Sequence, residues 1–228
     1  GIHQAIQDQT FIPLFCTSST KNIGVKRVCD FISKYGSSPD DRKIVKAKDE
    51  KGNVVDVSLE GSDTVLQIFK TMSESHVGEF SFFRVYSGEV QTGEDYHNSS
   101  RNIDERFGQM FLLNGKNRTQ VDKLYAGDIG GVVKLKDTHT GDTLSSGKHL
   151  KLPLLSLPNP NIHAAIRPTA KGDEEKLAVG LATLHEEDST FVYRVDSEVN
   201  QTIISGQGEL HLTVSTERLK RRFGIDIH

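Results

Sequence analysis

The sequence predicts a mixed fold, in which an antiparallel β-barrel is preceded by a short α/β segment and followed by an α+β domain. From about residue 65 to residue 150, short runs of aromatic and β-branched residues are separated by Gly, Asp and Ser. This pattern is typical of antiparallel strands joined by tight turns. After residue 158 the patterns follow the order β-α-β-β-α-β. That order is the split βαβ arrangement of a ferredoxin-like domain.

The composition indicates an ordinary water-soluble protein. The chain has 228 residues, enough for two domains, with 26% charged and 35% hydrophobic residues. No apolar run approaches the ~20 residues that span a bilayer, and no signal peptide opens the chain, so we expect a cytoplasmic protein without membrane contact. The net charge of −3 argues against a generally basic nucleic-acid binder. Cys16 and Cys29 lack close partners and are expected to be reduced thiols.

The first 40 residues are predicted to be one end of an α/β domain. Residues 11–16 form an apolar run that we interpret as a buried strand, with its proline at an edge or at the start. A polar loop and a helical pattern at residues 21–35 follow, and residues 36–41 have the composition of a linker. Because the rest of such a sheet is not found in this sequence, we expect residues 1–40 to be the C-terminal remnant of a larger domain plus a linker.

Residues 41–157 are predicted to form the barrel domain. Residues 46–55 resemble a small charged hairpin that turns at residues 51–53, and three prolines between residues 153 and 160 mark the exit from the barrel. We therefore place a domain boundary near Leu157. The aromatic residues are expected to fill the core and not to stack on bases. The expected core residues are Phe80, Phe82, Phe83, Phe107, Met110, Phe111, Leu112, Val121, Leu124 and Tyr125.

Residues 158–228 are predicted to form the ferredoxin-like domain. In its first helix, which Asp173 caps, Leu177, Leu181 and Leu184 recur at the i, i+4 and i+7 positions of a buried face. The expected elements are a strand at 162–168, a helix from 173, strands at 191–195 and 202–206, a helix at about 209–223 and a strand at 225–227.

The second helix of this domain has two different sides on a helical wheel of ~100° per residue. Leu212, Leu219 and Phe223 fall close together and predict the core face. Two groups of residues lie towards the opposite side and are expected to be exposed. They are the cations Arg218, Arg221 and Arg222 and the apolar residues Leu210 and Val214.

The residues that nucleotide hydrolysis requires are not found in this sequence. A phosphate-binding loop needs the pattern GxxxxGK followed by Ser or Thr. The nearest match, from Gly141 to His149, has one residue too many and His in place of the hydroxyl residue. His185 begins a His-Glu-Glu-Asp sequence that lacks the second His of a zinc helix, and Gly-Gln-Gly at 206–208 lacks the third glycine of a dinucleotide loop. We therefore predict no catalytic residue, no metal ligand and no enzymatic activity for this chain alone.

Five motifs are distributed over the two predicted domains. The barrel contains Phe-Phe-Arg-Val-Tyr-Ser-Gly at 82–88, the Gly-rich residues 124–133, and residues 137–144, which end in Thr-Gly-Asp-Thr-Leu. The C-terminal domain contains Glu-Glu-Asp-Ser-Thr-Phe at 186–191 and Ile-Ile-Ser-Gly-Gln-Gly-Glu-Leu-His-Leu at 203–212. Together they resemble the second and third domains of elongation factor G, the translational GTPase that drives ribosomal translocation. That family usually has Pro at the position of Ser189 and Met at that of Gln207.

The resemblance extends to the first 40 residues. The loop Thr-Ser-Ser-Thr-Lys-Asn at 17–22 resembles the guanine-contacting Gly-Ser-Ala motif and the following Lys-Asn pair of the family's GTP-binding domain. It implies that Ser18 and Ser19 are a remnant of the guanine loop. The alternative interpretation is an ordinary Ser/Thr N-cap loop.

The resemblance further implies a domain division and a function. Residues 1–40 would be the end of the GTP-binding domain, 41–157 domain II and 158–228 domain III. The chain would be the ribosome-binding middle portion of a GTPase that promotes translocation of tRNA and mRNA. GTP and magnesium would bind in the intact parent, and no cofactor in this part. The implied partners are ribosomal RNA and proteins, together with the missing GTPase and C-terminal domains of the same parent.

The same resemblance suggests roles for the exposed side of the second helix. Arg218, Arg221 and Arg222 would contact ribosomal RNA phosphates, or else form only a solvated cationic face at a helix C-terminus. Leu210 and Val214 would be covered by the missing GTPase domain. The alternatives for the whole chain are a tetracycline ribosomal-protection protein, a ribosome-recycling paralogue, or a non-enzymatic binding module with a translation-type barrel.

Overall fold

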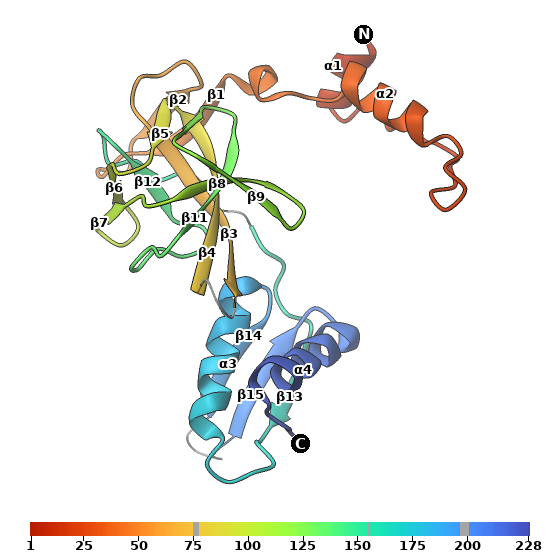
Figure 1. The fold of residues 1–228 in the computed structure, drawn as a ribbon, viewed down its shortest axis with the longest axis vertical. Helices are drawn as coiled ribbons and strands as arrows, with labels where there is room; N and C mark the ends of the chain where they lie inside the picture. Colours follow the sequence, from red (N-terminus) through yellow and green to blue (C-terminus); the bar gives the residue numbers. More distant parts are fainter. Residues whose placement is uncertain (75–77, 155, 197–200) are drawn as a thin grey trace. The chain divides into compact units, whose positions relative to one another are not determined.

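The structure is a computed structural model, and it describes residues 1–74, 78–154, 156–196 and 201–228 (Figure 1). The chain divides into two compact units, residues 1–44 and residues 45–228. None of the helices in the described ranges is both long and apolar enough to cross a membrane.

The first unit contains helix α1 (Ile2–Gln7), helix α2 (Val25–Tyr35) and a short 3-10 helix, η1 (Pro39–Arg42). The strand predicted at residues 11–16 is wrong: these residues are irregular, and Leu14 is 93% exposed. An apolar run forms a buried strand only when another strand pairs with it, and no described strand does so here. Helix α2 begins four residues later than predicted, because Asn22 and Gly24 adopt positive φ angles of 52° and 76° that a right-handed helix excludes.

The barrel domain of the second unit is built on one antiparallel sheet of eight strands. Along the sheet the strand order is β7-β6-β12-β3-β4-β11-β8-β9, and Figure 1 shows these strands curled around a common interior. The outermost strands, β7 and β9, each have one neighbour in the sheet, so the barrel is open. The strands are β3 (Val65–Glu74), β4 (Gly78–Ser87), β6 (Asp95–Asn98), β7 (Ile103–Arg106), β8 (Met110–Asn114), β9 (Asn117–Val121), β11 (Ile129–Val133) and β12 (Thr143–Ser145).

Two smaller strand pairs complete this domain. The predicted charged hairpin is formed by β1 (Ile44–Lys48) and β2 (Val54–Ser58), and β5 (Glu89–Gln91) pairs with β10 (Lys123–Tyr125). Asp49 organises the turn of the hairpin by accepting hydrogen bonds from the backbone N–H groups of Lys51 and Asn53.

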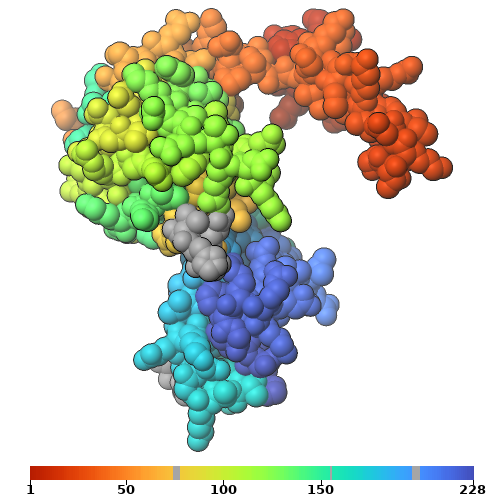
Figure 2. Space-filling view, viewed as in Figure 1, coloured from red at the N-terminus to blue at the C-terminus, as the bar shows by residue number. Residues whose placement is uncertain are grey.

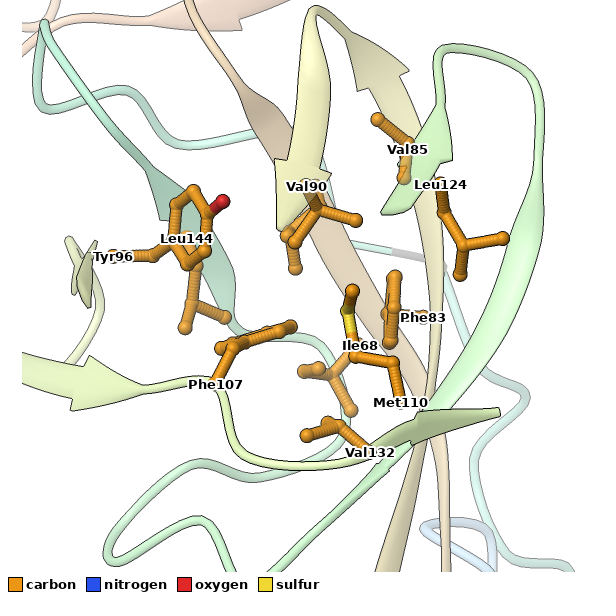
Figure 3. Packing of buried hydrophobic residues seen from close by; sticks show 11 residues of the cluster. Ile68, Phe83, Val85, Val90, Tyr96, Phe107, Met110, Leu124, Val132 and Leu144 are labelled. Carbon is orange, nitrogen blue, oxygen red and sulfur yellow. The ribbon is translucent and has the colours of Figure 1, made fainter. Parts of the chain in front are cut away.

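The barrel core confirms most of the predicted residues (Figure 3). Phe83, Phe107 and Met110 are fully buried and pack with Ile68, Val85, Val132 and Leu144. Tyr125 is 57% exposed, so its assignment to the core is wrong: in β10 it follows the buried Leu124, and successive side chains of a strand point to opposite faces. Leu112 is also exposed, because it lies beyond the last residue of β8 that pairs with β11.

The C-terminal domain has the predicted order of elements, β13 (Ile162–Ile166), α3 (Glu174–Glu187), β14 (Val192–Asp196), β15 (Gln201–Gly206) and α4 (Glu209–Phe223). Its sheet has the order β13-β15-β14. The last predicted strand is reduced to a single bridge between Ile227 and Pro168. Both helices pack on one face of the sheet and form one core, whose buried members are Ile166, Leu177, Leu181, Leu184, Phe191, Ile204, Leu212, Leu219 and Ile225.

The close packing of β11 against β4 generates a prediction about Gly131. A Cβ atom at this position would lie 2.1 Å from a ring carbon of the buried Phe80. Gly131→Ala should therefore destabilise the barrel by about 1–3 kcal/mol, the usual cost of overpacking a core. Thermal unfolding followed by calorimetry measures this as a lower Tm. Gly108→Ala is the matched control, because a Cβ atom there meets nothing within 4 Å. Equal Tm values for the two variants would contradict the packing argument.

Candidate functional site

The acidic motif at the end of α3 joins the C-terminal domain to the barrel inside the second unit. Helix α3 ends at Glu187, and Asp188 is its C-cap residue. Successive helical residues point ~100° apart, so adjacent side chains here can reach different neighbours. Glu186, Glu187 and Asp188 each bind a different segment of the chain, and we call this arrangement the carboxylate junction.

Glu187 forms the most strongly bonded part of the carboxylate junction. Its two oxygens accept hydrogen bonds from the two terminal nitrogens of Arg222, at 2.7 and 3.0 Å, and one also accepts the backbone N–H of Ser73 at 2.9 Å. Arg222 donates in addition to the carbonyl oxygen of Ser73 at 3.0 Å. The side chains of Glu187 and Arg222 are only 10% and 29% exposed. Bidentate, partly buried pairs of this kind are among the stronger hydrogen-bonded contacts, and this one links β3, α3 and α4.

Glu186 holds the loop that precedes β12. Its oxygens accept the backbone N–H of Thr140 at 3.0 Å and a hydrogen bond from Nδ1 of His139 at 2.9 Å. The other ring nitrogen of His139 lies 3.0 Å from a carboxylate oxygen of Asp137. Partial burial lowers the pKa of His139, but the charge of Glu186 and the hydrogen bonds to Asp137 and Glu186 together raise this pKa above its ordinary value of 6.5.

Buried polar groups fix the shape of that loop before it meets α3. Glu105, almost fully buried, accepts hydrogen bonds from the backbone N–H groups of Lys136 and Asp137 and from the hydroxyl of Thr138. Asp142 accepts the backbone N–H of His139 at 3.0 Å. A buried carboxylate is tolerated only when such donors satisfy it, so the loop is held in one conformation.

Asp188 connects the end of α3 to the start of α4. It accepts hydrogen bonds from the backbone N–H and the hydroxyl of Thr190 and from Nε2 of His211. Nδ1 of His211 accepts the backbone N–H of Gln207 at 3.1 Å, so the neutral imidazole satisfies both contacts. Partial burial raises the pKa of Asp188, but the hydrogen bonds from Thr190, with a contribution from His211, bring it below its ordinary value of 3.8.

A cavity of about 470 Å³ lies beside the carboxylate junction. Residues of β3, of the loop before β12 and of the segment that follows α3 line it. The lining residues are Gln67, Ile68, Phe69, Lys70, Thr140, Gly141, Leu154, Leu157, Glu187, Asp188, Ser189 and Thr190. Among the described residues, no group of three or more His, Cys, Asp or Glu side chains is placed to hold a metal ion. The contacts found here join elements of the fold, and the arrangement is suited to coupling them.

The predicted arginine cluster is divided by the structure. Arg218 and Arg221 are exposed on α4, as predicted. Arg222 is also an exposed residue, as predicted, but its guanidinium group is bound by Glu187, which lies 35 residues earlier in the chain. The sequence gives no sign of this pair, because folding brings together two residues that are 35 positions apart. The contact of these arginines with ribosomal RNA stays a prediction.

The outer side of α4 also exposes two apolar residues. Leu210 is 76% exposed and Val214 is 39% exposed. Figure 2 shows the helix region (dark blue) uncovered on the face in view. Isolated exposed apolar residues are common, but two on adjacent turns of one helix form a small continuous strip. The role of this strip as an interdomain surface stays a prediction.

The predicted guanine loop lies in the first unit. Ser18 exchanges backbone hydrogen bonds with Ile23, at 3.0 and 2.9 Å, and these close a tight loop around residues 19–22. The hydroxyl of Ser18 lies 3.5 Å from that of Thr20, and Ser19 is exposed. The role of both serines in contacting guanine stays a prediction.

Comparison with known proteins identifies both domains of the second unit. A family model described as elongation factor G domain 2 matches residues 64–147, and one described as elongation factor G, domain III, matches residues 157–228. The crystal structure of a protein from Thermus thermophilus is similar to the whole chain, with a TM-score of 0.78 and 25% sequence identity. The match covers 100% of this chain and 32% of that one, so the chain spans about a third of the length of this relative.

The open barrel followed by a ferredoxin-like domain therefore defines the middle portion of a translation factor. More narrowly, the chain belongs to the elongation factor G family and contains its domains II and III. The resemblance inferred from the five sequence motifs is confirmed.

The contacts of Arg222 generate a prediction about stability. Arg222→Met keeps the apolar stem but removes the guanidinium group. Of the hydrogen bonds to the nearly buried Glu187 named above, only the one from the backbone N–H of Ser73 then remains. We expect a loss of about 1–3 kcal/mol in the free energy of unfolding, measured by urea titration. Arg218→Met on the exposed side of the same helix should change it by less than about 0.5 kcal/mol. Equal losses would show that the ion pair does not stabilise the fold.

Proposed function

We propose that this chain is the ribosome-binding middle portion of an elongation factor G-like GTPase that promotes translocation of tRNA and mRNA in the cytoplasm. The observation that supports this proposal is the presence of domains II and III of elongation factor G in sequence on one chain. In this proposal GTP and magnesium bind to another part of the parent protein. In the same proposal, domains II and III bind the ribosome and transmit the nucleotide state of the GTPase domain to the rest of the factor.

A basic pocket on the barrel supports the proposed contact with RNA. It has a volume of about 640 Å³ and is lined by Arg106, Gly108, Gln109, Phe111, Arg118, Val133 and Lys134. Three of these residues are cations and none is acidic; Arg106 also pairs with Asp95, and the guanidinium group of Arg118 lies over the ring of Phe80. Phosphate groups of a nucleic-acid backbone are recognised by such clusters without regard to sequence. The net charge of −3 makes this local concentration of positive charge more informative than it would be on a basic chain.

The outer side of α4 offers a second surface in the same proposal. Arg218 and Arg221 are exposed and are proposed to contact ribosomal RNA phosphates. Leu210 and Val214 lie beside them on the helical wheel and are proposed to pack against the GTPase domain of the parent. Because Arg222 is bound to Glu187, we assign it to the carboxylate junction and not to RNA contact.

Ribosome sedimentation tests the arginine assignment. Arg218→Glu combined with Arg221→Glu should weaken association of this chain with ribosomes by about tenfold or more. The slope of log K against log salt concentration should become shallower by roughly one unit for each arginine replaced. Lys26→Glu with Lys171→Glu is the control, because it makes the same charge change at exposed residues that are not part of α4. Val214→Asp should leave the salt dependence unchanged. If the double arginine variant binds ribosomes as tightly as the unmodified chain does, the proposed contact of Arg218 and Arg221 with RNA is wrong.

A calorimetric titration tests the proposal that GTP binds to another part of the parent protein. The phosphate-binding loop of a GTPase is not found in these 228 residues. Titration of the chain with GTP and magnesium should therefore give no binding heat, even though Ser18 and Ser19 are proposed to contact guanine in the intact parent. A micromolar dissociation constant would contradict the proposal that nucleotide binding requires another part of the parent.

A further inference from the structure

His139 is held between two carboxylates at the carboxylate junction. Its Nδ1 lies 2.9 Å from an oxygen of Glu186 in α3, and its Nε2 lies 3.0 Å from an oxygen of Asp137 in its own loop. Ionised carboxylates only accept hydrogen bonds. A neutral imidazole has one N–H group and one lone pair, so it can satisfy one of these two contacts. Only the protonated ring donates to both.

The charges around His139 are mostly negative. Glu186 faces it from α3, Asp137 from the same loop, and Asp142 accepts its backbone N–H. The cation Arg101 also acts on it, and its Nε lies 3.6 Å from an oxygen of Asp142. Desolvation and Arg101 disfavour the protonated ring, but the neighbouring carboxylates outweigh them, so the pKa of His139 is raised.

The second histidine near the carboxylate junction, His211, has a different pair of partners. His211 donates from Nε2 to Asp188 and accepts the backbone N–H of Gln207 at Nδ1. This pattern matches a neutral ring, and a second proton would leave that N–H group without its acceptor. A neutral ring therefore satisfies both partners of His211, whereas it satisfies only one of the two carboxylates that face His139.

We propose that His139 is a pH-sensitive tie between the barrel and the C-terminal domain, closed when its ring is protonated and weakened when the ring loses a proton to solvent. This inference goes beyond the proposed function, because it requires neither the ribosome nor the rest of the parent. It concerns one of several described connections, since Thr140 also binds Glu186 and Ser73 binds Glu187 and Arg222. The contacts that Ser73 makes with Glu187 and Arg222 do not involve His139, so they should persist when the histidine contact weakens.

The direction of the pH dependence follows from the raised pKa. The contribution of His139 to stability is fully present below the ordinary value of 6.5, which represents the unfolded chain, and is lost as the pH rises through the higher value of the folded chain. The transition therefore begins near neutral pH and proceeds in the alkaline direction. The backbone N–H of Thr140 keeps its own contact with Glu186, so the loop is loosened and not released.

NMR spectra of the full chain between about pH 5.5 and 9 test the proposal, a range that brackets the ordinary titration of histidine. Ring carbon and proton shifts report the protonation of His139, and the backbone amide of Thr140 reports its contact with Glu186. We expect the ring to titrate with a midpoint above 6.5, and the Thr140 amide shift to follow with the same midpoint. The amide of Ser73, which donates to Glu187, should not follow it.

Two glutamine variants complete the experiment. In His139→Gln, which cannot become charged, the pH-dependent shift of the Thr140 amide should disappear. His149→Gln, which removes another titratable ring of the barrel that pairs with Glu50, should leave that shift unchanged. A midpoint at or below 6.5, or a Thr140 shift that persists in His139→Gln, would overturn the proposal. The proposal would also be overturned if the amide shift of Ser73 changed with the same midpoint as the ring of His139. That result would mean that the His139 contact and the Arg222–Glu187 pair weaken together.

Discussion

Three consecutive carboxylates at the end of α3 are the constraint on which the arrangement of the second unit depends. Glu186 binds the loop before β12, Glu187 binds β3 and α4, and Asp188 binds His211 in the first turn of α4. The segments that they join lie far apart in sequence, and Ser73 and Arg222 are separated by 149 residues. Because each carboxylate accepts charge-assisted or backbone hydrogen bonds, the connection is directional and not simply hydrophobic. Directional hydrogen bonds select one arrangement of the elements. An apolar contact of similar area would allow several arrangements, because it has no preferred direction.

The polar interior of the barrel supports this connection from the other side. Glu105 and Asp142 are buried or nearly so, and both accept hydrogen bonds from the loop that presents His139 and Thr140 to α3. Leaving a buried carboxylate without donors is costly, so the loop conformation and the burial of these groups depend on each other. The loop is thus ordered by contacts within the barrel, and the contact with Glu186 forms between two surfaces that are already shaped.

Helix α4 shows how one element serves two purposes. Its inner side supplies Leu212 and Leu219 to the core of the C-terminal domain, while its outer side exposes Leu210, Val214, Arg218 and Arg221. Arg222 lies between the two sides and is bound to Glu187. The helical period explains the division into sides, because positions three, four and seven apart share a face. In the proposed function the same geometry lets a helix that stabilises its own domain also present a surface to RNA and to the GTPase domain of the parent.

The sequence by itself determined the features that depend on local periodicity. Leu177, Leu181 and Leu184 predicted the buried side of α3, and the motifs at 186–191 and 203–212 predicted the family. The strand predicted at 11–16 is absent and the one predicted at 225–227 is only a bridge, because strand formation depends on a partner that an apolar run does not specify. Only the tertiary structure decided that Arg222 pairs with Glu187 and that His139 lies between Asp137 and Glu186. Hydrogen bonds between distant residues leave no periodic trace in a sequence, since their geometry exists only after the chain has folded.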